Sequence, residues 1–164
     1  MVPTTGKDEL RRAISIACKC LAYRDRSREE VTRHLAKKKL PLPVISEALD
    51  KLAALDYLND ERFAANWGRL RINNKKFGKI RVMQELIDKG VDPQLAEKTL
   101  DKVYMDVDER LLAETSAKKK LAQINNPDAN KKRRSVAQFL ARRGFAPDVI
   151  EQTIDRLIPS LTDG

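Results

Sequence analysis

The chain has 164 residues, of which 41% are hydrophobic and 35% are charged, and its formal net charge at pH 7 is +9. No apolar run approaches the roughly 18 residues of a membrane span, and the N-terminal residues hold no apolar signal core, so we expect a cytoplasmic protein with no membrane partner. The excess of Lys and Arg fits either an anionic polymer or an acidic protein face as the partner.

The first predicted helix covers residues 10–23, where apolar side chains recur at three- to four-residue spacing. Both cysteines, Cys18 and Cys20, fall in this segment. At about 100° per residue their side chains point to nearly opposite faces, so they cannot form a disulfide within the helix. We expect one or both to be small buried apolar side chains.

The second helix is predicted to start at a capping box, Ser27 to Glu30, in which the Ser hydroxyl and the Glu carboxylate accept from each other's backbone amides. This helix carries His34, the single His of the chain, with no nucleophile placed beside it. We interpret His34 as a packing or surface residue. One His and two nearby Cys do not make a zinc ligand set, so we expect no metal and no cofactor.

Three segments align without a gap: residues 35–45, 86–96 and 140–150. The same apolar positions recur in each segment, and the agreement extends upstream to Val31, Val82 and Val136. Self-similarity at a period of about 50 residues is typical of repeat proteins. Each copy is predicted to be a helix, a short turn and a second helix, preceded by a third helix. The sequence therefore predicts an all-α fold of three tandem three-helix, helix-turn-helix-like repeats, over residues 9–54, 55–104 and 105–158.

The turn inside each repeat has its own signal. Gly90 and Gly144 stand where the middle helix must end, because Gly adopts the left-handed conformation at little cost. Lys39 takes this place in the first repeat, so we expect that turn to be built differently. Asp92 followed by Pro93 is predicted to cap and start the last helix of the second repeat.

The last helix of each repeat is neutral or acidic. This weakens a DNA-binding helix-turn-helix interpretation, because the recognition helix would face phosphates at about 1.7 Å per charge. The basic residues lie instead in two acid-free windows, 62–84 and 129–147. Each of these windows fits either a partner-binding surface or a charged helix face that is only exposed to solvent. The candidate partner-binding residues are Arg62, Arg69, Arg71, Lys75, Lys76, Lys79, Arg81, Lys131, Lys132, Arg133, Arg134, Arg142 and Arg143.

Two further features have structural interpretations. The run Lys118 to Lys120 is interpreted as a solvated face. Phe63 and the single Trp, Trp67, are four residues apart, which favours packing between helices over a base-stacking platform. Nucleotide-binding glycine motifs and paired catalytic acids are absent from the sequence, and an enzyme would need acids from different repeats to converge. We therefore predict a binding protein with no catalytic residues.

Several stretches of the chain are distinctive. They are residues 57–64 (YLNDERFA), 78–81 (GKIR), 84–86 (QEL) and 89–91 (KGV) in the middle repeat, with 27–31 (SREEV) in the first repeat and 139–145 (FLARRGF) in the third. These stretches resemble the RecX family of regulatory proteins. The likeness extends over roughly residues 10–157, and the middle repeat is its most specific part.

The resemblance implies a modulator of RecA, the bacterial strand-exchange ATPase. Such a protein is expected to bind the groove of the RecA–DNA filament and mainly to inhibit its ATPase, strand-exchange and co-protease activities in DNA repair and the SOS response. The resemblance also implies an elongated, curved shape. We expect a monomer that binds the RecA filament, with single- or double-stranded DNA left open as a further partner. The alternative is a sequence-nonspecific nucleic-acid-binding helical module.

Overall fold

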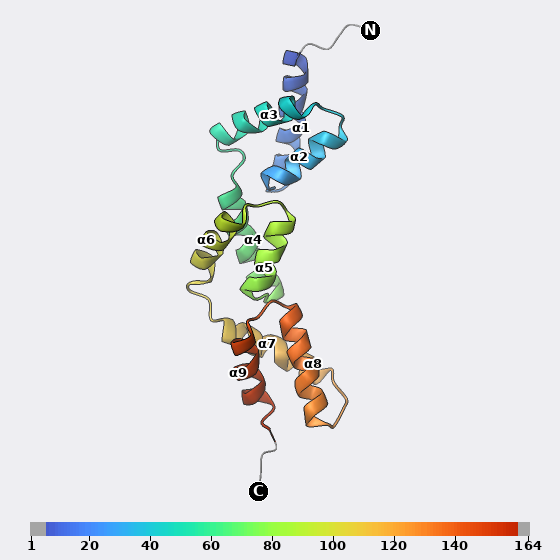
Figure 1. The fold of residues 1–164 in the computed structure, drawn as a ribbon, viewed down its shortest axis with the longest axis vertical. Coiled ribbons are helices and arrows are strands. Elements are labelled where there is room, and N and C mark those ends of the chain that lie inside the picture. The colour runs from blue at the N-terminus through green and yellow to red at the C-terminus, as the bar shows by residue number, and fades with distance from the viewer. Residues whose placement is uncertain (1–5, 161–164) are drawn as a thin grey trace. The chain divides into compact units, whose positions relative to one another are not determined.

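The computed structural model describes residues 6–160. Within this range the chain forms nine α-helices and no strand (Figure 1). The helices are α1 (Gly6–Tyr23), α2 (Arg28–Lys37), α3 (Leu42–Ala54), α4 (Asp60–Lys75), α5 (Lys79–Asp88), α6 (Pro93–Tyr104), α7 (Glu109–Ala122), α8 (Ala129–Arg142) and α9 (Pro147–Leu157). The prediction of an all-α fold is confirmed. No helix in the described part of the chain is both long enough and apolar enough to span a membrane.

The chain divides into two compact units. The first contains the residues up to Asn66 together with Leu86–Ala96, and the second contains Trp67–Glu85 together with the chain from Glu97 onward. Helices α4, α5 and α6 each contribute residues to both units. The boundaries of the three predicted repeats stay predictions.

Helices α1, α2 and α3 pack against one another in the first unit. Small residues of α1 allow close approach, since Ala13 and Ala17 are completely buried, and the branched side chains of α2 and α3 fill the space around them. The buried apolar core of this unit is Ala13, Ala17, Val31, Leu35, Leu40, Ile45, Ala48, Leu49, Leu52 and Leu58. Cys20 on α1 is buried and Cys18 is exposed, both as free thiols, so the packing interpretation holds for one of the two cysteines.

The predicted capping box begins α2. The Ser27 hydroxyl accepts from the Glu30 amide at 3.1 Å, and the Glu30 carboxylate accepts from the Ser27 amide at 3.0 Å. The same hydroxyl donates to the Lys89 carbonyl at 2.5 Å, so the start of α2 is joined to the end of α5 inside the first unit. Ser27 is completely buried. The cap therefore also serves the tertiary structure.

The three intra-repeat turns share one backbone conformation. Gly90 and Gly144 have φ angles of 78° and 89°, as predicted for residues that end a helix. Lys39 has a φ of 61°, so the prediction that the first turn is built differently is wrong. A lysine holds the left-handed conformation there without the freedom of glycine. The Asp92 carboxylate accepts from the Leu95 amide at 3.1 Å, which confirms the predicted start of α6.

Helices α7, α8 and α9 pack against one another in the second unit around a core that includes Val136, Leu140, Phe145 and Ile154. The turn after α8 also contacts the segment before α5. The Gly78 amide donates to the Arg143 carbonyl at 2.9 Å, and the Ile80 amide donates to the Gly144 carbonyl at 3.1 Å. This backbone joint places the end of α8 beside the end of α4 and the start of α5.

Candidate functional site

Five of the predicted partner-binding cations have acidic partners in space. Their acids come from outside the basic window, so the sequence pattern did not show them. The pairs are Arg62 with Asp56 (3.1 Å), Arg71 with Glu85 (2.8 Å), Arg81 with Glu85 (3.6 Å), Arg133 with Asp155 (2.5 Å) and Lys79 with Asp101. These cations help hold helices and turns together and are less available to a partner than the sequence suggested.

Glu85 of α5 is the centre of the most connected of these groups. Its carboxylate accepts from the Trp67 indole at 2.9 Å and from the Arg71 guanidinium at 2.8 Å. The Arg71 guanidinium lies 4.4 Å from the centre of the Trp67 ring. Arg71 therefore covers one face of Trp67, and Phe63 is buried. Both aromatic residues take structural positions, as interpreted from their spacing.

A series of cations and aromatic rings runs from this group toward α8. The Phe77 ring has the guanidinium carbons of Arg81 at 4.2 Å and Arg143 at 5.0 Å from its centre. Arg143 also lies 5.2 Å from the Phe139 ring centre, and the Lys120 ammonium lies 5.6 Å from the same ring. Aromatic faces attract cations, which lets several positive groups gather without an acid for each.

This series ends in a pocket of about 470 Å³ in the second unit, which we call the cationic pocket. The end of α4, one face of α7 and the end of α8 enclose it. It is lined by Asn73, Asn74, Lys75, Lys76, Thr115, Ser116, Lys119, Lys120, Gln123, Phe139 and Arg143. Five of these described residues are cations and none is an acid.

Arg143 is the most constrained cation of the pocket. Its guanidinium donates to the Lys75 carbonyl, while its Nε–H is buried and has no hydrogen-bond partner among residues 6–160. Burial, together with the nearby charge of Arg81, lowers the pKa of Arg143. A buried guanidinium N–H without an acceptor is unfavourable, so an acceptor at this position would be stabilised.

A second group of cations lies on α8. Lys131, Lys132, Arg134 and Arg142 form no ion pair with any acid among residues 6–160. Lys131 and Lys132 stand in the first turn, where the helix dipole disfavours positive charge, and Arg134 follows in the second turn. Asp128 caps the helix, accepting from the Asn130 and Lys131 amides at 2.9 and 3.2 Å, and so offsets part of this cost. Sequences that oppose local preferences in this way are typical of functional surfaces.

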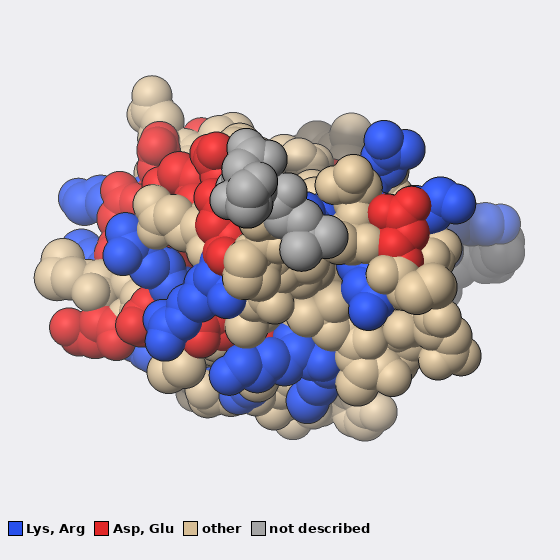
Figure 2. Space-filling model, turned by 90° about the horizontal axis from the view of Figure 1, so that it is seen from below, with Lys and Arg blue, Asp and Glu red and all other residues tan. Residues whose placement is uncertain are grey.

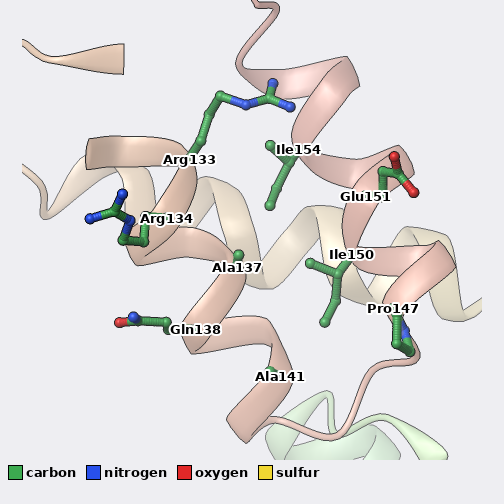
Figure 3. A pocket seen from close by; sticks show the side chains of 9 residues that line it. All are labelled: Arg133, Arg134, Ala137, Gln138, Ala141, Pro147, Ile150, Glu151 and Ile154. Carbon is green, nitrogen blue, oxygen red and sulfur yellow. The ribbon is translucent and has the colours of Figure 1, made fainter. Parts of the chain in front are cut away.

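An apolar groove lies between α8 and α9, and Arg134 is the one member of this group that lines it (Figure 3). Its volume is about 590 Å³. Ile150 and Ile154 project from α9 toward Ala137 of α8, and Arg133 and Arg134 stand at one end of the groove. The remaining lining residues are Gln138, Ala141, Pro147 and Glu151. The groove thus combines an apolar floor with a charged rim.

Charge of both signs is present on the face of the molecule that Figure 2 shows. Figure 2 shows a face on which basic and acidic side chains adjoin one another, with uncharged surface between them. Local groups, and not the overall charge, therefore define the candidate binding surfaces.

The structure brings Lys75, Lys76 and Arg143 together in the cationic pocket although they come from two separate windows. The predicted site omitted Lys119 and Lys120, because the run from Lys118 was interpreted as a solvated face. The signal that could have identified these two residues was a run of lysines in the last turn of a helix. Among the described residues, no group of three or more His, Cys, Asp or Glu side chains is placed to hold a metal ion.

Family models match the chain in three consecutive segments. The model of the first three-helix domain of RecX matches residues 13–52, that of the second matches residues 59–100, and that of the third matches residues 108–154. The nine helices of residues 6–160 and these three matches define an all-helical protein of three tandem three-helix domains. The matched models describe a family of regulatory proteins. The chain belongs to the RecX family of regulatory proteins.

Individual relatives carry the name "Regulatory protein RecX". The one from Pelodictyon phaeoclathratiforme is 30% identical over 89% of this chain and 89% of its own length. The one from Geobacillus kaustophilus is 36% identical over 87% of this chain, and the chain spans about half the length of that relative and of the one from Oceanobacillus iheyensis. The crystal structure of RecX from Lactobacillus salivarius matches with a TM-score of 0.82 and 28% identity, covering 92% of this chain and 97% of that one. The names indicate a regulatory role.

Proposed function

We propose that the protein binds the RecA recombinase filament and mainly inhibits its ATPase, strand-exchange and co-protease activities in DNA repair and the SOS response. Membership in a family of regulatory proteins supports this function. RecA is proposed as the partner because the sequence resembles RecX proteins. We further propose a cytoplasmic monomer that acts by occupying a surface of the filament, with no catalytic step.

The observation on this chain that carries the proposal is the surface of α8. Lys131, Lys132 and Arg134 have no acidic partner among the described residues, and Arg134 lines the apolar groove together with Ile150 and Ile154. An apolar pocket surrounded by charge is typical of a protein–protein contact, because burial of apolar side chains supplies affinity and the charges orient the partner. A protein partner with acidic and apolar side chains fits this surface.

A second candidate function is sequence-nonspecific nucleic-acid binding. The cationic pocket favours it, because its five cations have no acid beside them. Such binding would weaken steeply as salt concentration rises, and it would not require RecA.

The test adds the purified protein to preformed filaments of RecA on single-stranded DNA. ATP hydrolysis and filament length are followed by a coupled assay and by electron microscopy. The proposal expects both to fall at a protein concentration comparable to that of RecA. If both are unchanged while the protein still binds free DNA, the second candidate replaces the first.

A pair of charge-reversal variants locates the surface. Lys131→Glu with Arg134→Glu should weaken inhibition roughly tenfold or more, as expected when two charges at a contact are reversed. Lys37→Glu with Lys38→Glu changes the net charge equally at the exposed end of α2 and should leave inhibition unchanged. Equal losses in both variants would show that net charge, and not the α8 surface, is responsible.

A further inference from the structure

The cationic pocket concentrates more positive charge than its surroundings balance. Lys75 and Lys76 lie at the end of α4, Lys119 and Lys120 in the last turn of α7, and Arg143 follows α8. None of the five forms an ion pair with an acid in the described chain. Three separate elements therefore direct positive groups at one space of about 470 Å³.

Helix dipoles account for only part of this arrangement. The carboxyl end of an α-helix carries about half a negative charge, so the ends of α4, α7 and α8 together offset about one and a half of the positive charges. Roughly three to four positive charges are left around the pocket. Mutual repulsion between them disfavours the empty pocket, and a bound anion would relieve it.

The neutral side chains of the lining point to the kind of anion. Asn73, Asn74, Ser116 and Gln123 offer amide and hydroxyl donors beside the ammonium groups, whereas the Thr115 hydroxyl donates to the Leu111 carbonyl. Lys, Arg, Ser, Thr, Asn and Gln are the side chains that contact phosphate oxygens in nucleic-acid complexes. The guanidinium of Arg143 also lines the pocket, and its buried Nε–H has no acceptor within the described part of the chain.

We propose that this pocket is a phosphate-binding site, which takes a phosphate group of a nucleic-acid strand or of a free nucleotide. A phosphate offers more oxygen acceptors than a carboxylate and matches donors that converge from three directions. A side-chain carboxylate carries one charge on two coplanar oxygens and would leave most of the donors unused. The pocket volume also leaves room for the sugar next to the phosphate, beside the Phe139 ring. This inference does not depend on binding to RecA.

The experiment contains no recombinase. Binding of a fluorescein-labelled (dT)12 oligonucleotide to the full chain is measured by fluorescence anisotropy between 25 and 200 mM salt. Unlabelled ATP, inorganic tripolyphosphate and an octaglutamate peptide are added as competitors. Competition by ATP and tripolyphosphate against (dT)12 identifies phosphate as the recognised group, and the relative affinities of (dT)12 and ATP show whether a strand or a free nucleotide is the better source.

The test variant combines Lys75→Gln and Lys119→Gln, two exposed residues on different walls of the pocket. The matched control combines Lys37→Gln and Lys38→Gln, which likewise removes two lysine charges at the end of a helix. Affinity for the phosphate probes should fall about tenfold or more in the test variant, and the salt dependence of log K for (dT)12 should decrease by about 1.4, as two phosphate contacts are lost. The control should bind as the unmodified protein does.

Three results would overturn the proposal. They are equal losses in the test and control variants, no binding of any phosphate probe at 25 mM salt, and competition by octaglutamate that is stronger than that by tripolyphosphate. The last result would assign the pocket to an acidic protein segment. Far-ultraviolet circular dichroism of each variant confirms that the helices are retained. If the test variant loses helix, the binding measurement is repeated with the single variant Lys119→Gln. This variant must still bind phosphate more weakly than the unmodified protein.

Discussion

The backbone of Gly78 lies directly against the backbone of Gly144. The Gly78 amide donates to the carbonyl of Arg143, and a Cβ atom at position 78 would collide with the carbonyl group of Gly144. In the first unit the start of α2 meets the end of α5 in a comparable way, through the Ser27 hydroxyl and the Lys89 carbonyl. The first unit thus joins the start of α2 to the end of α5, and the second unit joins the start of α5 to the end of α8.

We predict that Gly78→Ala lowers the free energy of unfolding by about 2–3 kcal/mol, because backbone atoms must move to admit the methyl group. Urea denaturation followed by circular dichroism measures this change. Gly6→Ala is the control, since nothing lies within 4 Å of a Cβ at that position. A loss below 0.5 kcal/mol in Gly78→Ala would contradict the close packing of this joint.

Lys39→Gly should stabilise the protein by about 0.5–1 kcal/mol. A non-glycine residue in the left-handed conformation costs roughly 1–2 kcal/mol, and the greater freedom of glycine in the unfolded chain offsets part of the gain. Lys38 has an ordinary φ of −85°, so Lys38→Gly should give no gain. Thermal denaturation of the two variants compares them, and equal melting temperatures would show that Lys39 is not strained.

Glu30 should make the stability of the protein depend on acid pH. Burial opposes its ionisation, but hydrogen bonds from Arg24, the Ser27 amide and Lys89 outweigh burial and lower the pKa of Glu30 below 4.5. Because the folded-state pKa is the lower one, the ionised carboxylate stabilises the fold above about pH 4.5. This stabilisation is lost as pH falls through 4.5 toward the folded-state pKa.

Glu30→Gln tests this prediction by comparison of unfolding free energies at pH 7 and pH 3. The variant should be about 1–2 kcal/mol less stable at pH 7, because it loses charge-assisted hydrogen bonds, and the difference should shrink at pH 3. Burial raises the pKa of Asp60, which acts with the opposite sign, and repulsion from Glu30 adds a smaller part to this rise, so most but not all of the Asp60 contribution cancels from the difference. A difference that is constant with pH would contradict the assignment.

Arg71 is expected to be structural. Arg71→Glu would place a second carboxylate beside Glu85, which already accepts from the Trp67 indole, and should lower the free energy of unfolding by about 2–3 kcal/mol. Lys75→Glu, one turn further along α4 and without an acidic partner among the described residues, should change stability by less than 1 kcal/mol. Trp67 fluorescence during urea denaturation follows both variants. Similar losses would show that the Arg71 ion pair contributes little.

Much of the fold could be predicted from local patterns. The apolar spacing placed the helices, the run from Ser27 to Glu30 predicted the capping box, and Gly90 and Gly144 predicted the left-handed turns. Lys39 was misjudged because propensity disfavours lysine in that conformation, whereas the chain turns there between Leu35 and Leu40, which are both buried in the core of the first unit.

The candidate sites were less predictable, since charge patterns along a chain do not show which side chains meet in space. The acid-free window around Arg71 has Glu85 just beyond its end, and helical packing turns that acid back onto the arginine. Lys119 and Lys120 looked like a solvated run because the end of α4, which lines the pocket with them, is distant in the sequence. The residues of the pocket are known only once the helices are packed.

The two thiols of α1 make the protein suited to selective chemical labelling. Cys18 is exposed and Cys20 is buried, and the sequence has no other cysteine. A maleimide dye should therefore attach to Cys18 alone under native conditions, on a helix that contributes no residue to the cationic pocket or the apolar groove. Such a dye would report on binding to a filament or a strand without altering either surface.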